Sequence, residues 1–348
     1  MKQLFEAVEE GRPGPKWRKL FHNHWPAYRE PMHQESGSMV PTLFECRRAL
    51  QEHMPLWKPI WDEQVECVGG GDAEARFLSM WCPAPAVFAG TQAFWLGSGG
   101  PALLHNHDQA IPAQDVTWLS SRWGGQRVVA VTDHLCGALD GLNESGLAVA
   151  LSFGGRKVRG AGFGAQLIVR YLLEFAGTTR EAAAMLSKIP VSMTHSITLV
   201  DRLGNGSTVF VAPDREALVV PLRGIANHQH AVEWPEYAVS TQSRARCQAL
   251  DKAIAESSAQ EEMIAAMLTP PLYQRSSRRG HGTLYTAIYR PDGLRAELIW
   301  PTGGWVQSIH LFEEGVRHVA LFDGPRGGAT ERSFRSTMPG ELPELWPS

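Results

Sequence analysis

The chain has 348 residues, of which 43% are hydrophobic and 20% are charged, and this composition predicts a folded globular protein and excludes a disordered one. Its formal net charge of -3 gives no long-range attraction for nucleic acid or an anionic membrane, so we expect neither as a partner. Five scattered cysteines without a CxxC pair, no signal-peptide pattern and no membrane-spanning apolar run predict a cytoplasmic protein.

Residues 1–85 are rich in tryptophan and charge, and we expect them to form a helical accessory segment. The helical pattern breaks at "GRPGPKW", "REPM" and "VGGGD", where glycine and proline interrupt the 3.6-residue period.

From residue 86 the pattern changes to short apolar runs separated by turn residues, which indicates β-strands. "RLGNGS" and "RPDGLR" contain the Gly, Asn and Asp residues that tight hairpins need. Helical blocks follow at "FGAQLIVRYLLEFAG", "TTREAAAML" and "STQSRARCQALDKAIAES". We therefore predict an α+β sheet domain over residues 86–325, followed by a C-terminal tail over residues 326–348.

Thr91 is a candidate N-terminal nucleophile. If the bond between Gly90 and Thr91 broke, the Thr91 hydroxyl would attack and its own α-amine, with a pKa of roughly 7.7–8.0, would be the base. Asp108 lies past the turn at "GSGG", so we expect the strand containing "LLHNHD" to pair with the strand containing "TQAFWL". That pairing would place Thr91 and Asp108 on the same side of the sheet, where the carboxylate would hold the amine.

Several stretches, in order along the chain, resemble the family of acyl-coenzyme A:6-aminopenicillanate acyltransferases. These are N-terminal nucleophile (Ntn) hydrolases related to choloylglycine hydrolases. The stretches span roughly residues 86–300, and "LFHNHWPAYRE" resembles the propeptide-like part of the family. They are "AGTQAFW", "HNHD", "DGLNESGLAVALSFGGR", "GFGAQLIVRYLLEFAGTTREAAAML", "VDRLGNGSTVFVAPDR", "ANHQ" and "STQSRARCQAL".

The resemblance implies a four-layer αββα sandwich of mainly antiparallel sheets, self-cleavage before the nucleophile, and no cofactor. It implies amide (C–N) hydrolysis or acyl transfer through a covalent acyl-enzyme on a small acylated substrate, such as an acyl-coenzyme A or an amide. By motif, Asp108 would orient the nucleophile, Asn143 would line the pocket, and Asn227 would donate to the oxyanion. Arg246 would sit beside the nucleophile, with Arg244 as the near alternative.

The sequence departs from the family at two positions. The family nucleophile is usually a cysteine, and counting back about eighteen residues from Asp108 reaches Gly90. His105 stands in the substrate-binding region where the family has arginine, which removes a permanent cation. Three explanations stay open: Thr91 replaces the cysteine, Cys82 is the nucleophile, or the chain has lost catalysis and binds a ligand. We rank Thr91 first.

A metal-dependent hydrolase is the remaining alternative. His105 with His107, and His228 with His230, are each two positions apart, so each pair on a strand would point to one face and could bind a metal with Asp108. Against this, a strand that presents Asn106 inward would turn both neighbouring histidines outward. We therefore expect no metal, and the sequence leaves the substrate and the oligomeric state open.

Overall fold

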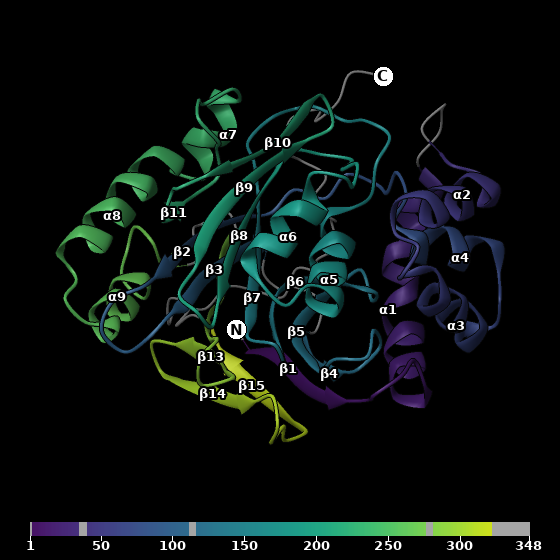
Figure 1. The fold of residues 1–348 in the computed structure, drawn as a ribbon, viewed down its shortest axis with the longest axis horizontal. Helices are drawn as coiled ribbons and strands as arrows, with labels where there is room; N and C mark the ends of the chain where they lie inside the picture. Colours follow the sequence, from purple (N-terminus) through teal and green to yellow (C-terminus); the bar gives the residue numbers. More distant parts are fainter. Residues whose placement is uncertain (1, 35–39, 111–115, 276–280, 322–348) are drawn as a thin grey trace, which may run out of the picture.

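The computed structural model describes residues 2–34, 40–110, 116–275 and 281–321, which form two β-sheets (Figure 1). The larger sheet contains, from one edge to the other, β10 (Arg215–Val220), β9 (Gly206–Ala212), β8 (His195–Asp201), β7 (Leu147–Phe153), β6 (Gly137–Asn143), β5 (Val128–Asp133), β4 (Val116–Ser121), β1 (Lys2–Glu9) and β15 (Gly315–Ala320). The smaller sheet contains β11 (Gly224–Ile225), β2 (Ala89–Trp95), β3 (Ala102–Ala110), β12 (His281–Arg290), β13 (Arg295–Trp300) and β14 (Gly303–Ser308).

Helices cover the outer face of each sheet. On the larger sheet, α5 (Ala165–Phe175) packs on β6 and β7, and α6 (Thr179–Leu186) packs on β8 and β9. On the smaller sheet, α8 (Ser243–Glu256) packs on β2 and β11, and α9 (Gln260–Met267) packs on β3. Because β2 and β3 contact β7 and β8 on their other side, the layers run helix, sheet, sheet, helix. The predicted α+β sandwich of mainly antiparallel sheets is confirmed.

The strands between these layers are buried on both faces. All seven residues of β7, "LAVALSF", are buried because one face packs on α5 and the other on β2. Such strands read as continuous apolar runs rather than as alternating patterns. Any polar side chain in them must find its partners inside the protein, since water cannot reach it.

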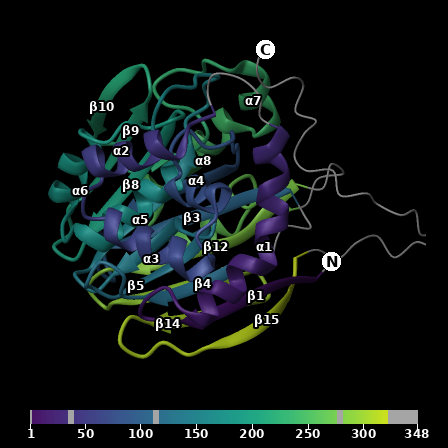
Figure 2. The same cartoon turned by 90° about the vertical axis from the view of Figure 1, so that its right-hand side faces the viewer.

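The N-terminal segment is helical over most of its length but begins with a strand. Residues Pro15–Gln34, Leu43–His53, Lys58–Val68 and Asp72–Ser79 form α1 to α4, which lie together against the sandwich (Figure 2). Lys2–Glu9, expected to be helical, instead forms β1, parallel to β4 and antiparallel to β15. Its burial alternates along "KQLFEAVE", with Phe5 and Ala7 buried, and this period of two is that of a strand. The predicted tail, residues 326–348, lies outside the described residues.

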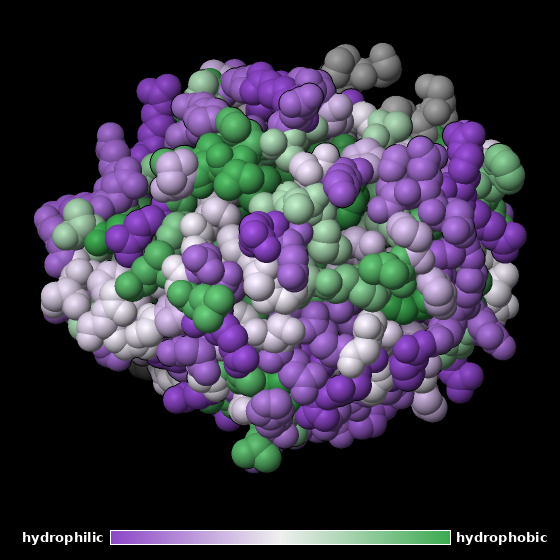
Figure 3. All heavy atoms as spheres, viewed as in Figure 1, coloured by the Kyte–Doolittle hydropathy of each residue, from purple (hydrophilic) through white to green (hydrophobic). Residues whose placement is uncertain are grey.

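Phe5 joins β1 to the smaller sheet. Its ring packs edge-on against Trp300 of β13, with centroids 4.9 Å apart, and against Tyr285 of β12 at 6.4 Å. The outer surface is mainly polar with scattered apolar side chains on the face drawn in Figure 3. No helix in the described part of the chain is long and apolar enough to cross a membrane.

We predict that Phe5→Ala lowers the free energy of unfolding by about 3–5 kcal/mol, because it leaves a cavity between the two sheets. Phe44→Ala is the matched control: Phe44 lies on α2 and is 73% exposed, whereas Phe5 is 1% exposed. The control should change the free energy by less than about 0.5 kcal/mol. Urea denaturation of the three proteins measures the difference, and equal effects would contradict the position of β1.

Candidate active site

The strands β2 and β3 form the predicted hairpin and set the geometry of the site. In their register Thr91 lies opposite Asn106, and Ala89 lies opposite Asp108. Side chains alternate along a strand, so Thr91, Asn106 and Asp108 share the face that α8 and α9 cover. The predicted pairing, with Thr91 and Asp108 on one side of the sheet, is confirmed. Gln92 and His105, which also lie opposite each other, face the larger sheet.

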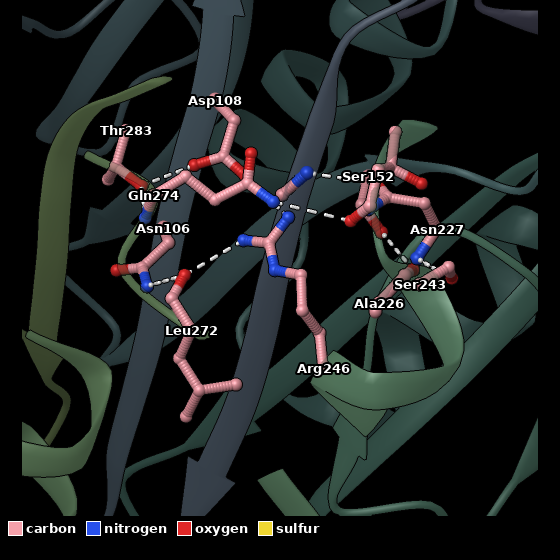
Figure 4. A network of polar contacts seen from close by, with 12 residues as sticks. Asn106, Asp108, Ser152, Ala226, Asn227, Ser243, Arg246, Leu272, Gln274 and Thr283 are labelled. Carbon is pink, nitrogen blue, oxygen red and sulfur yellow. Dashed lines mark hydrogen bonds and ion pairs between the residues drawn. The ribbon is translucent and has the colours of Figure 1, made fainter. Parts of the chain in front are cut away.

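Asp108 and Arg246 form a buried ion pair beneath the helix layer. The Arg246 Nη1 atom lies 2.6 Å from Asp108 Oδ2, and neither side chain is exposed to a significant degree. Thr283 donates its hydroxyl to Asp108 Oδ1 at 2.6 Å, and Arg246 Nη2 donates to the carbonyl of Leu272 at 2.9 Å (Figure 4). The sequence left Arg244 as an alternative, but Arg244 is exposed, so Arg246 is the residue that reaches Asp108.

Thr91 lies within β2 and is fully buried. Its hydroxyl makes no hydrogen bond with the described residues. The N–H of the preceding Gly90 donates to Asn227 Oδ1 at 2.9 Å, which leaves Asn227 Nδ2 without a hydrogen-bond partner in the same part of the chain. Asn227 follows β11, the strand that pairs with β2, so this pairing brings its amide to Gly90.

Gly90 makes a close backbone approach that a larger residue would prevent. A Cβ atom on Gly90 would lie 2.5 Å from the carbonyl oxygen of Asn106 and 3.2 Å from His105 Nε2. The first distance is a clash with backbone, so any side chain here requires a shift of β2 or β3. This hairpin therefore requires glycine at position 90, where the family resemblance leads one to expect cysteine.

On the inner face of the hairpin, His105 pairs with Asp140 of β6. Its Nδ1 lies 2.6 Å from Asp140 Oδ2, and both side chains are fully buried. Tyr285 donates to the same oxygen at 2.8 Å, and Tyr289 donates to Oδ1. Burial and the nearby Asp140 raise the pKa of both tyrosine hydroxyls well above the usual value, so they stay protonated donors. Asp140 thus holds His105 between the sheets, and the hydroxyls of Tyr285 and Tyr289 hold Asp140 in place.

The metal alternative is not supported by the geometry. We expected His105 and His107 to point outward, but both are buried because the larger sheet covers their face. They also face away from Asp108. His228 Nδ1 lies 2.6 Å from the Ser243 hydroxyl, and His230 packs edge-on against Phe210. The described residues contain no group of three or more His, Cys, Asp or Glu that could hold a metal ion.

Asn143 and Cys82 lie apart from the Asp108 group. The Asn143 amide donates to the carbonyls of Leu173 and Ala176 at the end of α5, at 2.9 and 2.7 Å, and accepts from the Leu147 N–H. Its side chain is fully used in joining β6 to α5, instead of lining a pocket. Cys82 lies between α4 and β2, where its N–H donates to the carbonyl of Gly162.

Sequence reasoning missed several polar residues that the structure brings to the hairpin. Asp140 pairs with His105 across 35 positions, and Thr283 binds Asp108 across 175. Gln92 Nε2 donates to the Ser152 hydroxyl at 3.2 Å, and Tyr237 donates to the carbonyl of Phe88. The sequence did contain a signal for Asp140: it is a charged residue inside the buried run "GALDGLN", and charged residues are rarely buried without a partner.

A family model described as acyl-coenzyme A:6-aminopenicillanic acid acyl-transferase matches residues 95–305, which is more than half of the chain. The matched range contains Asp108, Asn143, Asn227 and Arg246, and it begins after Thr91. No curated protein matches the sequence.

Solved structures with a related chain path include three hydrolases. Penicillin V acylase from Agrobacterium tumefaciens is 14% identical, covers 62% of this chain and 84% of its own, and has a TM-score of 0.44. A variant of conjugated bile acid hydrolase from Clostridium perfringens is 11% identical, with coverages of 68% and 100% and a TM-score of 0.47. The Caenorhabditis elegans ortholog of N-acylethanolamine-hydrolyzing acid amidase is 15% identical, with coverages of 62% and 99% and a TM-score of 0.44.

Buried histidines beside the hairpin predict that the protein loses stability in acid. Burial lowers the pKa of His195 from 6.5 to about 3, and burial followed by the neighbouring His105 lowers the pKa of His107. Below pH 6.5 the unfolded chain binds protons that the folded chain excludes, so the free energy of unfolding should fall as the pH falls toward 3. Each such histidine contributes at most about 1.4 kcal/mol per pH unit.

Urea denaturation between pH 7 and pH 4 tests this dependence. His195→Gln should reduce the slope by about one proton, whereas His230→Gln, at an exposed position, should leave it as in the parent protein. An unchanged slope in the His195 variant would contradict the buried, neutral state of this ring.

Proposed function

Since this chain belongs to the acyl-coenzyme A:6-aminopenicillanic acid acyl-transferase family, we propose that it cleaves or transfers the acyl group of an amide C–N bond through a covalent acyl-enzyme. The observation that carries the proposal is the buried ion pair of Asp108 and Arg246 on the sheet face that bears Thr91. Isolated buried charges are costly, so a buried pair needs further hydrogen bonds to hold it. Here Thr283 bonds to Asp108 and the Leu272 carbonyl bonds to Arg246, on the sheet face that bears the candidate nucleophile. The reaction needs no cofactor.

Self-processing would come first. The Thr91 hydroxyl oxygen would add to the carbonyl carbon of Gly90, the Gly90–Thr91 C–N bond would break, and the hydroxyl proton would pass to the departing amine. Water would then hydrolyse the resulting ester, leaving a carboxylate on Gly90 and a free α-amine on Thr91. Asp108 would hold that amine when it is charged.

Turnover would repeat the same chemistry on the substrate. The Thr91 oxygen would attack the substrate carbonyl, the α-amine would take the hydroxyl proton and pass it to the leaving amine, and an acyl ester would form. Asn227 Nδ2, which has no partner among the described residues, would donate to the oxyanion. Water or a second amine would then accept the acyl group. Arg246 would stabilise the ionised groups beside the nucleophile.

The substrate class is a small acylated molecule with an apolar acyl group, such as an amide or an acyl-coenzyme A. An apolar cluster of Phe153, Met193, Trp234 and Tyr237 supports this, because it lies next to the chain that precedes Gly90. We also propose a cytoplasmic location, supported by five cysteines that are scattered along the sequence without a CxxC motif.

A ligand-binding protein without catalysis is the second candidate. The fully buried side chain of Thr91 favours it, because a substrate cannot reach this hydroxyl while the bond before it is intact. In this candidate the chain stays uncut and Thr91 does not act as a nucleophile.

We predict that the purified protein is cut between Gly90 and Thr91, as measured by intact mass. Thr91→Ala should abolish both the cut and the hydrolysis of a phenylacetyl p-nitroanilide, because it removes the attacking oxygen. Thr91→Ser should keep part of each. Cys82→Ala is the control for the alternative thiol and should leave both unchanged. An uncut parent chain that fails to hydrolyse the anilide would support the binding candidate, and losses confined to Cys82→Ala would transfer the role to that thiol.

We further predict that Asn227→Ala lowers kcat on the same anilide by about 10²–10³, since one oxyanion donor is lost. Activity should survive dialysis against a chelator. Loss of activity in the chelator, with recovery on addition of zinc, would contradict the nucleophilic mechanism.

A further inference from the structure

Asn227, the proposed oxyanion donor, lies on an irregular stretch of chain. This stretch follows β11 and precedes α7 (Pro235–Ser240), so the position of Asn227 is not set by the ladder of a sheet or by the turns of a helix. Asn227 is nevertheless fully buried. An oxyanion donor acts because it is held in place before the reaction. The contacts that hold Asn227 are therefore part of the candidate active site.

The backbone of Asn227 contacts the chain just after β7 and the start of α8. Gly155 has a φ of +73°, and a Cβ atom on it would lie 2.4 Å from the Asn227 carbonyl oxygen, so glycine is needed against this stretch. The Asn227 N–H donates to the Ser243 hydroxyl at 3.0 Å (Figure 4). The side chain is held as well, because its Oδ1 accepts from the Gly90 N–H at 2.9 Å.

Ser243 is the first residue of α8, and its buried hydroxyl serves the Asn227 stretch instead of its own helix. The N-cap of α8 is Gln242, whose side chain makes no capping hydrogen bond within the described chain. A serine at the N-cap would accept from a first-turn N–H of the helix. Ser243 lies one position later, and its hydroxyl bonds to Asn227 and His228. This use of the hydroxyl indicates a role at the site.

His228 sets the direction of the Ser243 proton. Its Nδ1 atom lies 2.6 Å from the Ser243 oxygen. Because that oxygen already accepts from the Asn227 N–H, the hydroxyl has its own proton to donate to Nδ1. Burial, and then the charge of Arg244, lower the pKa of His228 from 6.5, so the ring is neutral near pH 7 and Nδ1 can accept. The two bonds together hold the hydroxyl in a single orientation.

We propose that Ser243 and His228 are positioning residues for the reaction proposed above, on which this inference rests. His228 orients the Ser243 hydroxyl, and Ser243 holds the backbone of Asn227. The bond from Gly90 to Oδ1 then leaves Nδ2 as the end of the Asn227 amide that is available to the oxyanion. In this arrangement neither positioning residue bonds to the substrate, so their loss slows the chemical step and leaves substrate binding unchanged.

Steady-state kinetics on phenylacetyl p-nitroanilide test the proposal in full-length protein that intact mass shows to be cut. Ser243→Ala should lower kcat about tenfold or more and change KM by less than about twofold, because a small displacement of a catalytic group is costly to the rate. Ser240→Ala is the matched control. Ser240 is exposed on α7 and donates to the Tyr237 carbonyl of its own helix, so its loss should leave kcat unchanged.

A double variant separates positioning from a general loss of structure. If Ser243 acts through Asn227, Ser243→Ala should cause no further loss of kcat in protein that already carries Asn227→Ala, whereas independent losses would multiply. His228→Ala is the second variant in case Ser243→Ala does not fold, and it should also lower kcat about tenfold. His228→Asn should restore most of the activity, because its side-chain oxygen can replace Nδ1 as the acceptor.

Nitrogen NMR of the His228 ring gives a readout that does not depend on activity. Near pH 7 we expect a neutral ring with its proton on Nε2. The positioning proposal alone is overturned if folded Ser243→Ala keeps the kcat of an active parent, if the losses multiply in the double variant, or if the neutral ring carries its proton on Nδ1. A folded Ser243→Ala chain that stays uncut would support it, since the Gly90 carbonyl would be attacked at the same site. A parent that is neither cut nor active overturns the proposed function, and the positioning roles with it.

Discussion

The register of β2 against β3 is the constraint on which the candidate site depends. Both faces of this hairpin are covered, one by helices and the other by the larger sheet, so its polar side chains meet protein groups on either side. A slip of one residue would exchange the two faces of β3 and carry Asp108 away from Arg246 and His105 away from Asp140. The buried Asp108–Arg246 ion pair on one face and the buried His105–Asp140 contact on the other therefore fix one register.

Incompletely bonded polar atoms are also concentrated at this hairpin. Natural proteins leave few buried polar atoms without a partner, and those that remain need a specific explanation. Along and beside β2 and β3, the buried atoms without a hydrogen-bond partner among the described residues include Thr91 Oγ1, Gln92 Oε1, His105 Nε2, His107 Nδ1 and Asn227 Nδ2. A core built only for stability would favour apolar groups here, so the cluster supports a role in binding or chemistry.

How much the sequence could predict depended on whether the evidence was local. The hairpin was predictable because its turn and two apolar runs are contiguous, and the layers followed from the family resemblance. β1 was missed because its charged residues suggested a helix, while its partners β4 and β15 lie far along the chain. Asp140 was also missed, because its partner His105 lies 35 positions away along the chain. The choice of Arg246 over Arg244 needed the helix orientation, since two positions turn the side chain by about 200°.

In the proposed mechanism, Gly90 would link the processing of the chain to its chemistry. Because a side chain at this position would meet the Asn106 carbonyl, the hairpin excludes a nucleophile where the family usually has cysteine. The next hydroxyl, that of Thr91, is fully buried within an intact strand. Breaking the Gly90–Thr91 bond would free the start of this strand and create the base that the hydroxyl needs. Under the proposed mechanism, processing and catalysis at Thr91 would be a single property, and a chain that keeps the bond would have neither.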